Sequence, residues 1–355
     1  MQKYYCKNCG AELYWDADSQ SLKCEYCDNE YLPSDFEDAS LSKNPVKSEE
    51  ANKQYTSAGQ DLSDDMVVYK CNNCSGEVIA DKKTVATVCP YCGRALSITS
   101  KIVGEFRPDL VLPFKVGKDK AVSAYEEYVS KSHLTPKEFR SNRVISKIQG
   151  MYVPYYLVTD TAQGDIVYNC EKVWSRRSGY DKVVTHKVYD VYISGVARFR
   201  QVPGDASEKL NDTFMDTIEP FDYSTISSFN PGYMAGFIAD IADVDKKSVV
   251  DRILEKIKKG LLPLLSEEVG YWNTKSLKSY TCNHKDIKSE YAMLPIWIVS
   301  EEYQGTIYTF GVNGVTGKVV GKLPLSKSLL AGKAGIAFAI GFVATALVTG
   351  ISSIL

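Results

Sequence analysis

Histidine is scarce in this chain, and the common catalytic motifs are missing. Only three of the 355 residues are histidines, and none of them lies in an HExxH pattern. The sequence also has no GxSxG nucleophile elbow, no phosphate-binding P-loop and no GxGxxG fingerprint that opens a helix after a strand. We therefore expect a protein that is not an enzyme.

An excess of positive charge is missing as well, because 42 basic residues face 44 acidic ones. A protein whose whole surface attracts nucleic acid would need a clear positive excess. The first residues lack the basic segment and apolar run of a signal peptide, which predicts a cytoplasmic location for the N-terminal part. Thiols stay reduced in that compartment.

Cysteine is abundant and regularly spaced. Eight of the ten cysteines form four CxxC pairs, and two segments each follow C-x2-C-x14-C-x2-C, the second starting 65 residues after the first. A matched internal repeat is far less probable by chance than one such motif. The first set is Cys6, Cys9, Cys24 and Cys27, and the second set is Cys71, Cys74, Cys89 and Cys92.

This spacing predicts two zinc ribbons, each holding one structural Zn²⁺. Four thiolates at about 2.3 Å from the ion complete a tetrahedral site that has no open position for a substrate. Rubredoxin-like iron is the nearest rival, but its loop between the cysteine pairs is usually longer. Gly10, Gly76 and Gly93 follow the cysteine pairs, where a backbone with positive φ is useful.

The charge of the ribbons favours proteins over nucleic acid as partners. Residues 1–32 carry three lysines against six acidic residues, and a zinc ion with four thiolates adds about −2. Residues 67–100 carry four basic residues against two acidic ones, so the second site roughly cancels that excess. Phosphate binding needs clustered Lys and Arg, which neither segment has.

Composition divides the chain into five parts and predicts a multidomain fold. These are a first zinc ribbon (1–32), a flexible acidic linker (33–65), a second ribbon (66–100), an α+β domain with a mostly antiparallel sheet (101–326) and a transmembrane helix (329–355). The polar linker leads us to expect that the ribbons are separate from each other, like beads on a string.

Within the α+β domain, aromatic and β-branched runs predict strands, and apolar residues at helical spacing predict two helices. The strands fall within 110–114, 151–159, 164–170, 183–200 and 294–302, a hairpin turn at 313–317, and the helices at 118–131 and 246–259.

The end of the sequence predicts a membrane anchor. Residues 334–355 contain no charge, and 22 helical residues span about 33 Å, enough to cross a hydrocarbon core of about 30 Å. Three lysines precede the run and no charge follows it, which predicts a single-pass protein with its N-terminal domains in the cytoplasm. A buried helix of a soluble core is the alternative. Ala337, Gly341 and Thr345 share one helix face, which could pair with another membrane helix.

Three weaker signals remain open. Cys282 and His284 could form a nucleophile or metal pair, and Glu219 with Asp222 could form paired carboxylates, although caps and solvated groups are commoner. Residues 172–187 hold five basic residues against one acidic residue, whereas 201–245 hold nine acidic residues against one lysine. These segments could pair within the domain, the basic one could face anionic lipid, or both could be solvated.

Residues 202–226, 236–245 and 294–324 resemble a Gram-positive bacterial family of TFIIB-type zinc-ribbon-containing proteins, and the stretch MDTIEPFDY is the most specific part. The resemblance implies a membrane-anchored partner of envelope-stress proteins of the phage-shock protein A and SPFH types. We therefore expect a tail-anchored scaffold that recruits cytoplasmic proteins to the membrane. The alternatives are a membrane-tethered nucleic-acid-binding regulator and an enzyme whose pocket the sequence does not reveal.

Overall fold

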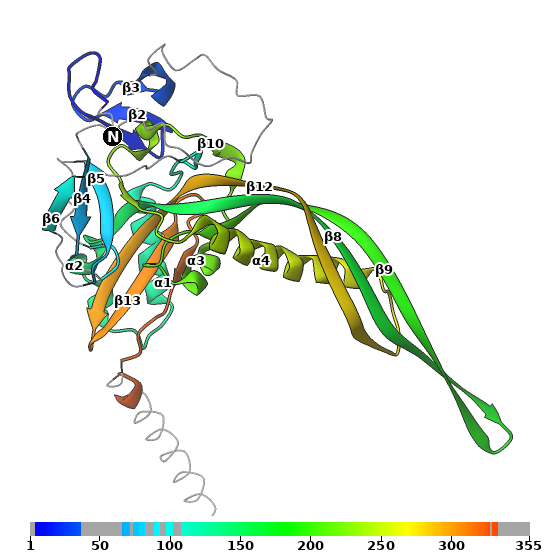
Figure 1. The fold of residues 1–355 in the computed structure, drawn as a ribbon. Helices are drawn as coiled ribbons and strands as arrows, with labels where there is room; N and C mark the ends of the chain where they lie inside the picture. Colours follow the sequence, from blue (N-terminus) through cyan, green and yellow to red (C-terminus); the bar gives the residue numbers. More distant parts are fainter. Residues whose placement is uncertain are drawn as a thin grey trace, which may run out of the picture.

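The computed structural model of the chain describes residues 4–36, 66–71, 74–81, 89–92, 97–101, 108–326 and 329–332. Figure 1 shows a body that carries both cysteine-rich segments and a long β arm that leaves the body on one side. Most of the predicted linker, 37–65, lies outside the described residues.

The first cysteine-rich segment forms a small antiparallel sheet of three strands. These are β1 (Leu13–Asp16), β2 (Ser21–Cys24) and β3 (Glu30–Tyr31), followed by the 3₁₀ helix η1 (Pro33–Phe36). Leu13 and Trp15 are buried while Tyr14 between them is exposed, because neighbouring side chains on a strand point to opposite faces.

The remaining strands form one sheet of eleven strands. Its main path follows the order β10-β7-β12-β8-β11-β5-β4-β6. Outside this path, β13 pairs with β12, β14 pairs with β13, and β9 pairs with β8. The β11–β8 and β12–β7 pairs are parallel and the other pairs are antiparallel. The strands are β4 (Met66–Lys70), β5 (Glu77–Asp81), β6 (Ser97–Lys101), β7 (Leu110–Val111), β8 (Gln149–Ser178), β9 (Asp181–Asp205), β10 (Ser227–Ser228), β11 (Ile238–Asp240), β12 (Thr274–Tyr303), β13 (Thr306–Asn313) and β14 (Val319–Gly321).

Both predicted helices are confirmed, and the second is longer than expected. The helices are α1 (Lys118–Ser130), α2 (Asn142–Ile145), α3 (Asp212–Ile218) and α4 (Lys246–Glu267), with η2 (Lys137–Arg140), η3 (Tyr223–Thr225) and η4 (Pro231–Met234). The predicted hairpin at 313–317 is also confirmed, because β13 and β14 pair antiparallel across it. The predicted mixture of α and β structure is therefore correct.

Helix α4 packs along the inner part of the arm. Its buried side chains recur every fourth residue and so form one stripe, at Val249, Ile253, Ile257, Leu261 and Leu265. The strands beneath the helix carry glycine at its closest approach. A Cβ at Gly204 would lie 2.7 Å from Ile253, and one at Gly164 would lie 2.6 Å from Leu265, so larger residues would force the helix away.

Two β-bulges face each other across β8 within the arm, and bulges of this kind bend a strand. On the β9 side the register shifts between Val158 and Asp160, and on the β12 side it shifts between Lys285 and Lys288. The extra residues include Gln201 at φ 51° and Asp286 at φ 56°, a left-handed backbone conformation. We call this level of the arm the corner. Figure 1 shows β8, β9 and β12 curving away from the body as they lead into the arm.

The two ribbons are not structurally independent, because each contacts the body. Strand β5 of the second ribbon pairs with β11, so this ribbon belongs to the large sheet. The first ribbon packs on η4 through Trp15, whose ring centroid lies 4.8 Å from that of Tyr233. Trp15 Nε1 also donates a hydrogen bond to the Phe114 carbonyl at 3.4 Å. The expectation failed because a polar linker sets no limit on contacts between segments distant in sequence.

The predicted transmembrane segment lies almost entirely outside the described residues. Only residues 329–332 are described, and they are helical. Ala337, Gly341 and Thr345 are therefore not described. Among the residues that are described, none belongs to a helix with both the length and the apolar character needed to cross a bilayer.

Candidate metal centres

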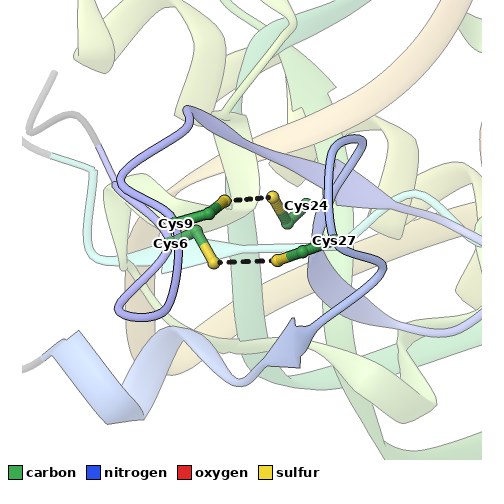
Figure 2. Close-up of side chains that lie close together, drawn as sticks. All are labelled: Cys6, Cys9, Cys24 and Cys27. Carbon is green, nitrogen blue, oxygen red and sulfur yellow. Dashed lines mark hydrogen bonds between the residues drawn. The ribbon is translucent and has the colours of Figure 1, made fainter.

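The four cysteines of the first set converge in the structure. Cys6 and Cys9 lie before β1, Cys24 ends β2, and Cys27 lies in the turn before β3. Figure 2 shows the four side chains pointing toward one another from two facing loops. The Sγ atoms of Cys6 and Cys27 are 3.4 Å apart, as are those of Cys9 and Cys24.

The second set repeats this arrangement. Cys71 Sγ lies 3.5 Å from Cys92 Sγ, and Cys74 Sγ lies 3.7 Å from Cys89 Sγ. In each set all four sulfur atoms lie within 4.8 Å of one another. All the cysteines are free thiols, and their separations are far longer than the roughly 2.05 Å of a disulfide bond.

These distances fit a tetrahedral zinc ion. Sulfur atoms at about 2.3 Å from a central ion lie about 3.8 Å apart in an ideal tetrahedron, and the observed pairs are close to that value. Each set supplies four ligands, so a metal bound there would keep no position for a substrate. The predicted ligands are therefore brought together as two groups that can each hold a metal ion, zinc being the one that the thiol set favours.

The same backbone turn recurs at the three CxxC pairs for which the structure describes the residue that follows the pair. The carbonyl of the first cysteine accepts a hydrogen bond from the amide four residues on, at 2.8 Å for Cys6, 3.0 Å for Cys24 and 2.9 Å for Cys71. The donor residue has a positive φ in each turn: Gly10 at 74°, Asp28 at 55° and Ser75 at 56°.

The prediction for Gly10 is thus confirmed, whereas that for Gly76 is wrong. The left-handed position in that turn belongs to Ser75. Gly76 is needed for space instead, because a Cβ there would lie 2.5 Å from the ring of Tyr91. Gly93 lies outside the described residues.

The surroundings shift the pKa of one thiol in each site. The Tyr31 hydroxyl lies 3.4 Å from Cys6 Sγ, and this hydrogen bond lowers the pKa of the Cys6 thiol to about 6. Burial raises the pKa of the Cys89 thiol in the second set. Zinc binding requires thiolates, so metal uptake at the second set must release protons that burial otherwise retains.

The second site is tied to the body by two buried polar contacts. The Tyr91 hydroxyl, between Cys89 and Cys92, donates a hydrogen bond to the Asp240 carboxylate on β11. Ser300 on β12 donates to the Pro90 carbonyl at 2.7 Å. Val78, Tyr91 and the ligands Cys71, Cys89 and Cys92 share one apolar core with residues of β8 and β12. The second metal site is therefore part of the core of the body.

Cys282 and His284 lie on one face of β12, with Asp160 beside them at the corner. His284 Nδ1 lies 2.6 Å from Asp160 Oδ2, and Cys282 Sγ lies 3.8 Å from His284 Nε2. A nucleophilic cysteine needs a lowered pKa, but burial raises the pKa of the Cys282 thiol. No local pattern in the sequence pointed to Asp160, which lies 124 residues before His284.

Glu219 and Asp222 are not a pair of carboxylates. Glu219 lies 3.0 Å from Lys256 on α4, whereas Asp222 accepts a hydrogen bond from the Ser224 amide and caps η3. Asp222 therefore has the commoner role of an acidic residue in a turn, which is to cap a helix. The acidic segment pairs with α4 rather than with the basic segment 172–187, through the ion pairs Asp205–Arg252, Asp212–Arg252, Asp216–Lys256 and Glu219–Lys256.

One four-cysteine centre on a small sheet and a second one built into the large sheet of an α+β body define a protein with two ribbon-type sites that could each hold a metal ion. The chain belongs to the same family as the uncharacterized protein YdjG of Bacillus subtilis (strain 168). The two are 30% identical over 333 residues, which is 92% of each chain. No family model matches the sequence. No solved structure matches it either.

Proposed function

We propose that this protein is a membrane-anchored, non-enzymatic zinc-ribbon scaffold that recruits cytoplasmic proteins. Exposed apolar side chains on the first ribbon carry this proposal. Tyr26, between the ligands Cys24 and Cys27, is 85% exposed, and Tyr5 and Leu32 are about half exposed. Tyrosine is enriched where proteins dock on one another, and a metal-held loop presents such side chains at low conformational cost.

The metal sites support a structural role in that scaffold. All four ligands of each site come from the protein, so zinc there would hold the loop geometry rather than activate a substrate. The acidic first ribbon is a poor partner for phosphates, which supports protein partners over nucleic acid. By resemblance, the partners would be of the phage-shock protein A and SPFH types.

The anchor in this proposal is the uncharged run 334–355, with Lys322, Lys327 and Lys333 on its cytoplasmic side. Deletion of 329–355 should release a protein that otherwise stays in the membrane fraction after carbonate extraction. Carbonate release of the intact chain would contradict the anchor.

Recruitment is tested by co-purification from cross-linked membranes. Tyr26→Ser should lower the yield of partner proteins at least fivefold while the zinc content stays at two per chain. Tyr271→Ser is the matched control, because Tyr271 is similarly exposed, at 88%, but lies between α4 and β12. Equal partner recovery from the two variants would remove the first ribbon from the docking surface.

A further inference from the structure

The outer end of the arm has only two strands. Strand β12 begins at Thr274, opposite Glu171, and beyond that level β8 and β9 pair only with each other. We call residues 172–187 the arm tip. It contains seven cross-strand pairs, from Lys172↔Lys187 to Ser178↔Asp181, closed by Gly179 and Tyr180. At about 3.3 Å per residue it extends about 20 Å beyond the three-stranded part (Figure 1).

The arm tip carries positive charge that its surroundings do not neutralise. Asp181 is its one acidic residue. Lys172 and Lys187 are directly opposite each other, and their ammonium groups lie over the rings of Trp272 and Trp174, at 4.7 and 5.5 Å from the ring centroids, which leaves their charge in place. Among the described residues, no ion pair involves any cation of the tip. These cations are Lys172, Arg176, Arg177, Lys182 and Lys187.

Apolar side chains are exposed among these cations. Tyr180 at the turn is fully exposed, and Trp174, Val183 and Val184 are each about two-fifths exposed. Val183 and Val184 are adjacent on β9 and so point to opposite faces. A two-stranded hairpin with both faces in water is only marginally stable. The composition therefore suits a binding surface rather than a solvated strand pair.

We propose that the arm tip docks on an anionic phospholipid surface. Clustered Lys and Arg are attracted to anionic headgroups, and Trp and Tyr favour the interface between headgroups and hydrocarbon. Nucleic acid would satisfy the cations but would leave the two valines in water. The tip and the helical turn 329–332 both extend to the lower side of the body in Figure 1. The inference does not require residues 333–355 to cross the membrane.

The test measures amide hydrogen exchange in the full-length protein on vesicles. Vesicles of mixed phosphatidylglycerol and phosphatidylcholine should slow exchange within 172–187, whereas phosphatidylcholine alone should not. Arg176→Gln with Arg177→Gln removes two cations without adding a carboxylate. At the usual contribution of one basic residue near an anionic surface, the docking equilibrium should weaken about 30-fold. Added salt should weaken docking of the wild-type tip, because the attraction is screened.

The matched control is Lys247→Gln with Lys259→Gln, which removes two exposed cations from α4 and should leave protection of the tip unchanged. Unchanged exchange in α4 and β12 verifies that each variant is folded. Equal exchange of the tip on both kinds of vesicle would overturn the proposal, as would protection by duplex DNA without protection by phosphatidylglycerol. Protection of the tip in a protein that carbonate strips from membranes would support tip docking and contradict the anchor.

Discussion

Loss of the second metal should destabilise the body as well as the ribbon. The perturbation is Cys89→Ser, which removes one buried ligand of the second set. Three ligands hold zinc far less well than four, and metal binding supplies most of the folding free energy of a small zinc module. The loop with Tyr91 should then leave the core beside β11.

The size of the effect follows from the contacts that the second ribbon makes with the body, through Val78 on β5 and through Tyr91 in this loop. Val78 and Tyr91 are 0% and 8% exposed, and burial of two such side chains contributes about 4 kcal/mol. The hydrogen bond from Tyr91 to Asp240 adds about 1–3 kcal/mol. A total of about 5 kcal/mol should lower the melting temperature of a body of this size by roughly 10–20 °C.

The assay combines metal analysis with calorimetry and hydrogen exchange at β11 (Ile238–Asp240). Wild type should hold two zinc ions per chain, and Cys89→Ser should hold one and exchange faster at β11. Cys282→Ser is the control, because Cys282 belongs to neither set, and it should keep both ions. A Cys89→Ser protein with one zinc ion but an unchanged melting temperature would refute the coupling. Iron in place of zinc, or almost no metal, would refute the sites themselves.

Two further predictions concern the body. Gly204→Val should destabilise the body by about 1–3 kcal/mol in denaturant titration, because the new Cβ would lie 2.7 Å from Ile253. Gly260→Ala on α4 is the control and should not destabilise it. Equal stability of the two variants would contradict the close approach between β9 and α4. Burial raises the pKa of Glu219 to about 7 from 4.5, so the folded state binds more protons and stability should fall as pH rises through that range. Glu219→Gln should remove up to about 3 kcal/mol of this pH-dependent loss of stability. If the difference in unfolding free energy between wild type and the variant stays the same at every pH, the prediction is wrong.

The sequence predicted the elements that depend on local spacing. Both cysteine sets, helix α4 and the turn at 313–317 follow patterns that a few neighbouring residues determine. The full length of the long strands was not predicted, because β8 consists of two apolar runs joined by a polar stretch. Near the tip both of its faces are exposed, so the alternation that marks a half-buried strand is lost.

Contacts between distant segments explain the remaining differences. Trp15 meets Tyr233 across more than 200 residues, and Tyr91 meets Asp240 across 149. No local pattern in a single sequence reveals such pairs. The sequence therefore predicted which cysteines come together in two groups of four, but not that the loops carrying them pack into the body.

The facing bulges at the corner make the arm a spacer of fixed direction. A hinge needs a segment with few cross-strand contacts, yet pairing resumes on both sides of β8 within two residues of each bulge. Gln201 is also held there, because its backbone N–H donates a hydrogen bond to the Thr159 hydroxyl at 3.2 Å. The arm tip and the body are thus joined by one continuous sheet, and the first ribbon packs on that body through Trp15 and Tyr233. A protein held by that ribbon would stand at a constant height above whatever surface the tip contacts.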